Sequence, residues 1–137
     1  MVSMQDTPAA GQPTMVQPQA GQFVFAKSRY AAVWIPQVVR RAPSAKAWEP
    51  TSAEKIAHFE SVVANSGSYE VSGSRVTLRP VVAKMPEFAG GYLTYEFRIE
   101  GDELTLEAVD EKSADNITPP NYEKNREKLR LRRVADR

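Results

Sequence analysis

Residues 92–109 read YLTYEFRIEGDELTLEAV, and this stretch decides the fold class. Apolar side chains occupy every second position on both sides of Gly101–Asp102, a pair that suits a tight hairpin turn. A period of two is typical of β-strands that bury one face. The side chains expected on the buried face are Leu93, Tyr95, Phe97, Ile99, Leu104, Leu106 and Ala108. The stretch therefore predicts an antiparallel β-hairpin.

The same period extends upstream, so residues 67–109 as a whole predict a run of antiparallel strands joined by tight turns. Ser72-Gly73-Ser74 is expected to form one of these hairpin turns. Pro80 cannot donate a hydrogen bond to a neighbouring strand, which places it at a bulge or at a sheet edge. The direction of the Arg79 side chain depends on that choice, because a bulge shifts the alternation of faces.

Two more strands and one helix are predicted before this run. Residues 22–27 and 30–35 are rich in aromatic and β-branched side chains, and the second of them suits a sheet with both faces at least partly covered. A helix is predicted over about residues 52–64, because Thr51 and Glu54 have the spacing of a capping box. The helical stripe expected to be buried consists of Ile56, Phe59 and Val63.

The remaining segments complete a pattern of seven strands and one helix. Gly67 is expected to cap the helix in the left-handed conformation. Residues 110–127 predict a polar loop, and residues 128–134 predict a last strand in which leucines alternate with basic residues. Residues 1–21 are rich in Pro, Gln, Thr, Ala and Gly and predict a flexible N-terminal arm before a β-domain at 22–137.

Composition excludes several kinds of chemistry. The chain has no cysteine and a single histidine, His58, so disulfides, thiol nucleophiles and the common zinc sites are not expected. A nucleophile elbow of the Gly-x-Ser-x-Gly type and a phosphate-cradling glycine loop are both missing from the sequence. We therefore expect no metal and no cofactor, and we expect His58 on the surface.

Length and hydropathy point to one domain. A chain of 137 residues can bury a sizeable core, and it contains no apolar run long enough to cross a membrane. Residues 1–21 lack the basic and apolar regions of a signal peptide. The expected location is the cytoplasm, or an exported location if a signal peptide is absent from this sequence.

Charge is distributed unevenly along the chain. Residues 87–115 carry nine acids and two bases, whereas residues 122–137 carry seven bases and three acids. The basic strand invites a nucleic-acid interpretation, but the alternation places its charges opposite those of the acidic strands, which favours cross-strand ion pairs. The outward acids Glu96, Glu100, Glu103 and Glu107 are accordingly expected to be solvated rather than to serve as a buried acid–base pair.

Three segments resemble bacterial lipocalin-like domain proteins of the calycin type. These segments are VANSGSYEVSG at 63–73, LRPVVAK at 78–84 and TYEF at 94–97, together with GQFVF at 21–25 and Tyr30. The resemblance covers roughly residues 20–134. It implies a mainly β, up-and-down antiparallel calycin-like barrel of about eight strands with an internal cavity. Such domains usually begin with a strand containing Gly-x-Trp, and residues 1–19 have no Trp. Either the first strand is degenerate, or it is missing and the barrel is open there, in which case a second copy in a homodimer could close the open edge.

Two functions follow as hypotheses. The first is binding of a small hydrophobic or amphipathic molecule inside the barrel, without nucleic acid as a partner. The second is a small cofactor-free barrel enzyme, an isomerase, cyclase or hydrolase, that uses Tyr, Arg or carboxylate groups in the cavity. The side chains expected to contact a ligand are Phe23, Phe25, Tyr30, Trp34, Tyr69, Arg79, Tyr95 and Phe97.

Overall fold

The computed structural model describes residues 2–7, 14–15, 20–36, 41–120, 122–124 and 126–134. Within these residues nine strands form one sheet, in the order β2-β1-β9-β8-β7-β6-β5-β4-β3. The strands are β1 (Val2–Thr7), β2 (Thr14–Met15), β3 (Gly21–Ala26), β4 (Arg29–Trp34), β5 (Val63–Ser72), β6 (Arg75–Ala83), β7 (Tyr92–Glu100), β8 (Glu103–Lys112) and β9 (Arg126–Arg132). One α-helix, α1 (Ser52–Glu60), and two short 3-10 helices, η1 (Pro86–Phe88) and η2 (Tyr122–Lys124), complete the described elements.

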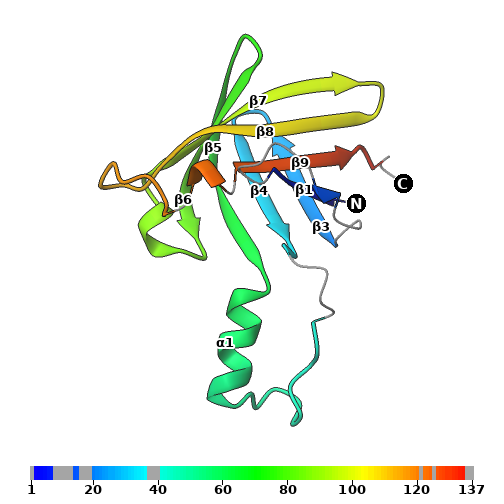
Figure 1. The fold of residues 1–137 in the computed structure, drawn as a ribbon, viewed down its shortest axis with the longest axis vertical. Coiled ribbons are helices and arrows are strands. Elements are labelled where there is room, and N and C mark those ends of the chain that lie inside the picture. Colours follow the sequence, from blue (N-terminus) through cyan, green and yellow to red (C-terminus); the bar gives the residue numbers. More distant parts are fainter. Residues whose placement is uncertain are drawn as a thin grey trace.

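The strands β3 to β9 correspond to the seven that the sequence predicts. Each pairs antiparallel with the next along the chain, and together they curl into a half-barrel (Figure 1). The mainly β, up-and-down architecture is therefore confirmed, and the expected number of about eight strands is close. On the far side of β9, β1 pairs with β9 and β2 pairs with β1. The division into an arm and a domain at residue 21 stays a prediction.

The core lies on the inner face of the curl. Alternate residues of β4 are buried, whereas Ala31 and Val33 between them are exposed. The outer face of β4 therefore meets solvent, although Val33 on that face is only 51% exposed. The buried cluster consists of Tyr30, Ala32, Trp34, Val76, Leu78, Leu93, Tyr95, Leu106, Ala108, Tyr122, Leu129 and Leu131.

Two irregularities in strand pairing set which side chains face inward. Between β5 and β6 the register shifts at Ser66/Gly67, which leaves Val81 as an extra residue beside Pro80. Pro80 thus lies at a bulge, as predicted, and its side chain is buried. Between β7 and β8 the register shifts at Thr94/Tyr95, which leaves Val109 as the extra residue. Bulges of this kind redirect the side chains that follow them.

Gly67 has a different role from the one predicted. It lies within β5 and not at the end of a helix, so the helix-cap prediction is wrong. A Cβ atom built on Gly67 would lie 2.0 Å from the carbonyl oxygen of Arg79 on β6. Glycine is therefore needed because two backbones approach each other at the bulge.

The helix is shorter and more exposed than the sequence predicts. The capping box of Thr51 and Glu54 is present, but α1 ends at Glu60 and the chain enters β5 at Val63. The prediction of a buried stripe is wrong: α1 has no buried residue, and Ile56 and Phe59 are 59% and 47% exposed. The reason is visible in Figure 1, where α1 projects away from the sheet instead of lying across it.

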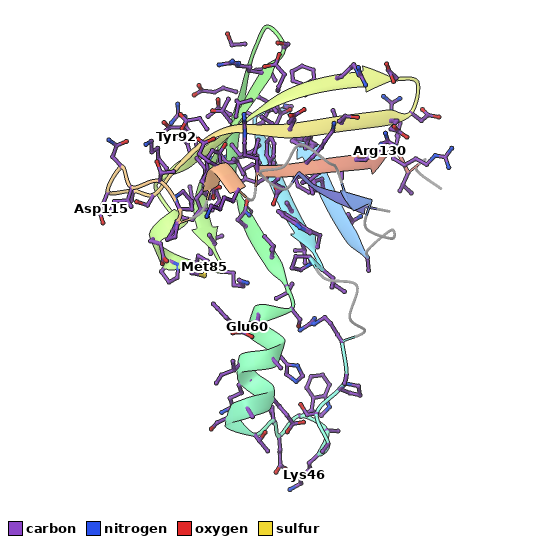
Figure 2. All side chains as sticks on the ribbon, in the orientation of Figure 1. Lys46, Glu60, Met85, Tyr92, Asp115 and Arg130 are labelled. Carbon is purple, nitrogen blue, oxygen red and sulfur yellow. The ribbon has the colours of Figure 1, made fainter. Side chains whose placement is uncertain are left out.

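The connection that precedes α1 is fastened to the helix by polar contacts. His58 lies within hydrogen-bond distance of the Ser44 hydroxyl, 3.1 Å away, and Arg41 donates to the Ser61 hydroxyl at 2.8 Å. Figure 2 labels Glu60 near the sheet and Lys46 at the far tip of this projecting segment. The projecting segment, which consists of the described part of the connection and α1, is therefore held together mainly by its own local contacts.

Candidate functional site

The inner faces of β7, β8 and β9 form successive rows, because the register aligns apolar residues across the three strands. The row nearest the β7–β8 turn consists of Ile99, Leu104 and Leu131, and the next consists of Phe97, Leu106 and Leu129. Leu106 and Leu129 are almost fully buried, whereas Ile99 is exposed and Leu104 is half-buried. The inner face therefore changes from a packed core to an open apolar mouth towards this turn.

A cavity of about 580 Å³ opens at this mouth, between β3 and the ends of β7, β8 and β9. The inner-face residues that line it are Phe23, Phe25, Ile99, Leu104 and Leu131. The charged residues that line it are Asp102, Glu103, Arg132 and Arg133. In the described part of the chain, β3 has β4 as its only strand partner, so the cavity lies at an open seam of the sheet.

The aromatic residues predicted to contact a ligand fall into two groups. Phe23 and Phe25 line the cavity. Trp34 stacks on Phe23 with ring centroids 5.3 Å apart, and Tyr69 meets Phe25 edge-on at 5.2 Å. The other three, Tyr30, Tyr95 and Phe97, belong to the core or pack against it. The cavity therefore has an aromatic wall that is two rings deep on the β3 side.

Arg79 lies apart from the other predicted residues. Because Val81 is the bulged residue, the alternation before it is undisturbed: Leu78 and Pro80 face inward and Arg79 faces outward. Its guanidinium lies 3.7 Å from the Glu70 carboxylate and 5.9 Å from the centre of the Tyr92 ring. The structure therefore does not bring Arg79 into the interior.

Polar groups gather on the inner face deeper in the curl than the mouth. The Tyr30 hydroxyl donates to the side-chain oxygen of Asn65 at 2.6 Å, and the Tyr95 hydroxyl donates to the Glu127 carboxylate. Burial raises the pKa of the Tyr30 hydroxyl. Burial, reinforced by the Glu127 charge, raises the pKa of Tyr95 well above its ordinary value. Both tyrosines are therefore held in the neutral, hydrogen-bonding form.

Glu111 is turned inward by the second bulge. It pairs with the buried Leu93, whereas Asp110 pairs with Thr94 and accepts a hydrogen bond from Tyr92 at 2.7 Å. Burial raises the pKa of the Glu111 carboxyl above its ordinary value of 4.5. A carboxyl group in such surroundings can hold or release a proton closer to neutral pH than a solvated one.

Two buried polar atoms have no hydrogen-bond partner among the described residues: the indole nitrogen of Trp34 and the hydroxyl of Tyr122. The Trp34 ring stacks on Phe23, which lines the cavity. Tyr122 belongs to η2, and the raised pKa of its hydroxyl comes mainly from burial. Unpaired buried donors are uncommon in proteins, which sets these two positions apart from the rest of the core.

The charged strands pair on the outer face, as the sequence predicts. Arg130 lies 3.3 Å from Glu103, and Lys128 lies 3.9 Å from Glu107. Glu96 is exposed and pairs with Arg75 at 3.2 Å. Hydrogen bonds from Ser74 and Arg75 lower the pKa of the Glu96 carboxyl. Lys128 and Arg130 of β9 thus meet acids of β8, which weakens the case for a nucleic-acid surface.

The described residues contain no group of three or more His, Asp or Glu side chains that could hold a metal ion. They also contain no helix with the length and apolar character needed to cross a membrane.

Comparison with protein families agrees with this geometry. The model of the lipocalin-like domain family matches residues 2–134, which is nearly the whole chain. The chain belongs to the lipocalin-like domain family. No curated protein and no solved structure matches it. The match includes the segment that holds β1, which the sequence predicts as part of an arm.

Sequence reasoning missed much of what lines this lipocalin-like interior. Asn65 lies between the predicted helix and its expected cap at Gly67, and Glu111 and Glu127 lie in the predicted polar loop. The sequence does contain a signal for Glu127. Leu131 and Leu129 face inward at every second position, and the same alternation reaches Glu127. No pattern marks Glu111, since its direction depends on the extra residue Val109 in the pairing with β7.

Proposed function

We propose that this lipocalin-like protein binds a small hydrophobic or amphipathic molecule in the cavity beside β3. The observation that carries the proposal is the cavity of about 580 Å³ with an inner lining of Phe23, Phe25, Ile99, Leu104 and Leu131. Ligand pockets in proteins enclose roughly 300–1,000 Å³ and are mostly apolar with a few polar groups. Covering exposed apolar surface releases about 25 cal/mol per Å², so the open apolar mouth favours an apolar occupant.

The two tryptophans of the chain offer a direct test. Trp48 is 98% exposed and Trp34 is 3% exposed, so Trp48→Phe leaves one buried reporter that stacks on a cavity-lining ring. We expect the Trp34 emission of this variant to change on titration with alkanols, alkanoates or hydrophobic aromatic compounds. Native mass spectrometry should show the bound compound in one-to-one ratio. If none of these classes binds by either measurement, the proposal fails.

A matched pair of variants locates the binding. Ile99 and Ile117 are 60% and 62% exposed, but only Ile99 lines the cavity. Lysine at either position should therefore cost little stability. Ile99→Lys is expected to weaken binding because it places a charge in the apolar lining, and Ile117→Lys is expected to leave binding unchanged. Equal binding by both variants would place the ligand elsewhere.

A second candidate function is a cofactor-free barrel enzyme, an isomerase, cyclase or hydrolase. It is favoured by the inward Glu111, whose pKa is raised by burial, together with the hydrogen-bonded pair Tyr95 and Glu127. Carboxyl groups with raised pKa values serve as general acids and bases. Compounds that bind in the titrations should be incubated with the protein and followed by mass spectrometry and NMR. Conversion that Glu111→Gln abolishes would support this candidate, and unchanged compounds would remove it.

A homodimer closed through β3 is a further proposal. In the described residues, the edge of β3 opposite β4 carries no strand, and unpaired edges readily accept another strand. A proline at Phe23, in the middle of β3, should dissociate such a dimer if it forms through this edge, because the alternation of pairs with β4 directs the N–H of Phe23 away from β4. Light scattering after size-exclusion chromatography measures the mass of both forms, and a monomeric natural protein would remove the proposal.

A further inference from the structure

The mouth of the cavity carries an arginine that continues the inner face of β9. Arg133 follows Leu131 by two residues, so it shares the alternation of the buried leucines. Its backbone N–H donates to the carbonyl oxygen of Asp102 at 2.8 Å, which extends the pairing of β8 and β9 by one step. Arg133 also lines the cavity. Its guanidinium therefore belongs to the row just outside Ile99, Leu104 and Leu131.

The charges at this mouth are not balanced. Of the acids that line the cavity, Glu103 is paired with Arg130 on the outer face at 3.3 Å. Within the described residues, neither Arg132 nor Arg133 has an ion-pair partner, and the Asp102 carboxylate has none. Among the described residues that line the cavity, two arginines without an ion-pair partner therefore stand against one unpaired carboxylate.

We propose that the cavity takes an amphiphile with a carboxylate head, held at Arg133 with its apolar body among Phe23, Leu104 and Leu131. This inference rests on the proposed ligand-binding function and specifies the class of ligand. A guanidinium presents two parallel N–H donors that match the two oxygens of a carboxylate. The apolar lining beside it lowers the local dielectric, which strengthens such a pair relative to one in open water.

The acids inside the half-barrel fix the orientation of the ligand. Glu127 and Glu111 lie deeper on the inner face, beyond the packed row of Leu106 and Leu129. A ligand whose carboxylate entered first would bring that charge towards these acids. The carboxylate would lose its hydration without gaining a cation as a partner. The head therefore stays at Arg133 and the chain points inward. Arg132, on the outward alternation of the same strand, adds positive charge at the rim.

The test compares three compounds with the same alkyl chain: dodecanoate, dodecanol and dodecylammonium. Each is titrated into the Trp48→Phe protein below its critical micelle concentration, with Trp34 emission as the readout. Binding of dodecanol measures the apolar cavity alone. We expect dodecanoate to bind about tenfold more tightly than dodecanol, because charged hydrogen bonds contribute about 1.5–3 kcal/mol and each 1.4 kcal/mol is tenfold.

Matched charge variants assign the preference to one residue. Arg133→Gln should reduce the ratio of dodecanoate to dodecanol affinity to about one, whereas Arg79→Gln should leave it unchanged. Arg79 is a suitable control because it carries the same charge on the outer face, away from the cavity. The ratio is taken within each variant, so a general loss of stability does not imitate the effect. Raising the salt concentration should weaken dodecanoate binding and spare dodecanol.

Several results would overturn the inference. Equal affinity for dodecanoate and dodecanol, or a preference for dodecylammonium, would reject the carboxylate head and leave the apolar cavity supported. A carboxylate preference that survives in Arg133→Gln would reject the assignment to Arg133. If neither dodecanol nor any other apolar compound binds, the proposed function itself fails.

Discussion

The hydroxyl of Tyr95 on β7 donates a hydrogen bond to the carboxylate of Glu127 on β9, although β8 lies between these two strands. The residue of β8 that pairs with Tyr95 is Ala108, which is buried and has only a methyl side chain. The small side chain leaves room for the tyrosine to reach across. Three adjacent strands are thus tied together on the inner face by one polar contact.

Removing the hydrogen bond between Tyr95 and Glu127 should lower the stability of the folded protein. Tyr95 is completely buried, and a buried hydrogen bond to a charged group contributes about 1.5–3 kcal/mol. We expect Tyr95→Phe to lower the free energy of unfolding by an amount in that range, measured by urea denaturation. Tyr92→Phe is the control, because Tyr92 on the same strand donates to Asp110 on the outer side. Equal losses in the two variants would contradict the special role of the inner bond.

The half-buried carboxyl of Glu111 should make stability depend on pH. Its pKa is raised in the folded protein above the ordinary value of 4.5, so the folded state binds the proton more tightly than the unfolded state. This contribution to stability is complete below pH 4.5 and is lost as the pH rises through the raised pKa. Glu111→Gln should remove that loss. Unfolding curves from pH 4 to 8 should show a variant whose advantage over the natural protein grows with pH.

An advantage that is constant across pH would mean that Glu111 is ionised equally easily in both states. Asp110→Asn is the matched control, because Asp110 is the preceding acid and takes the outward alternation. Its effect should not follow the pH dependence expected of Glu111→Gln.

The close approach at the first bulge predicts a severe effect of one methyl group. Gly67→Ala would place a Cβ 2.0 Å from the Arg79 carbonyl oxygen, so the two backbones must separate. Overpacking costs typically about 1–3 kcal/mol, and a rigid backbone neighbour leaves little relief. Gly73→Ala is the control: its φ of +58° is strained for alanine, but nothing lies within 4 Å of the added carbon. Thermal unfolding should rank Gly67→Ala as clearly the worse of the two.

Because α1 is exposed, substitutions at the two helical positions that the sequence assigns to a core should be tolerated. Replacing Ile56 and Phe59 together with serine should change the free energy of unfolding by less than about 1 kcal/mol, since exposed positions rarely matter more. Leu106→Ala, in the buried cluster, should cost about 2–5 kcal/mol. A large loss in the serine variant, measured by the same denaturation, would mean that α1 packs against the sheet.

Local patterns predict the strands of this protein well and the helix less well. Alternation identifies β3 to β9 because each has one buried face, and the capping box of Thr51 and Glu54 identifies the start of α1. The end of α1 was misplaced because Val63 suits a helical stripe and a strand equally well. Periodicity also assigns Ile56 and Phe59 to a core, although it carries no information on whether a neighbouring surface exists to cover them.

The candidate site was predicted in part for similar reasons. Phe23 and Phe25 share the inner alternation of β3 and do line the cavity, and Ile99, Leu104 and Leu131 were expected to face inward. The position of the cavity at the seam could not be predicted, because it depends on how far the sheet curls. The curl is a property of all the strands together and not of any one segment. Ligand contact by the aromatic residues stays a prediction.

The extra residue Val109 gives β8 one residue more than β7 at this point, and it does so without disturbing the pairs on either side. If Val109 were deleted, Ala108 would be followed directly by Asp110, which would still pair with Thr94, and Glu111 would still pair with the buried Leu93. The bulge therefore absorbs a change of one residue in chain length. Relatives can differ in length at such a position and still present the same side chains to the interior.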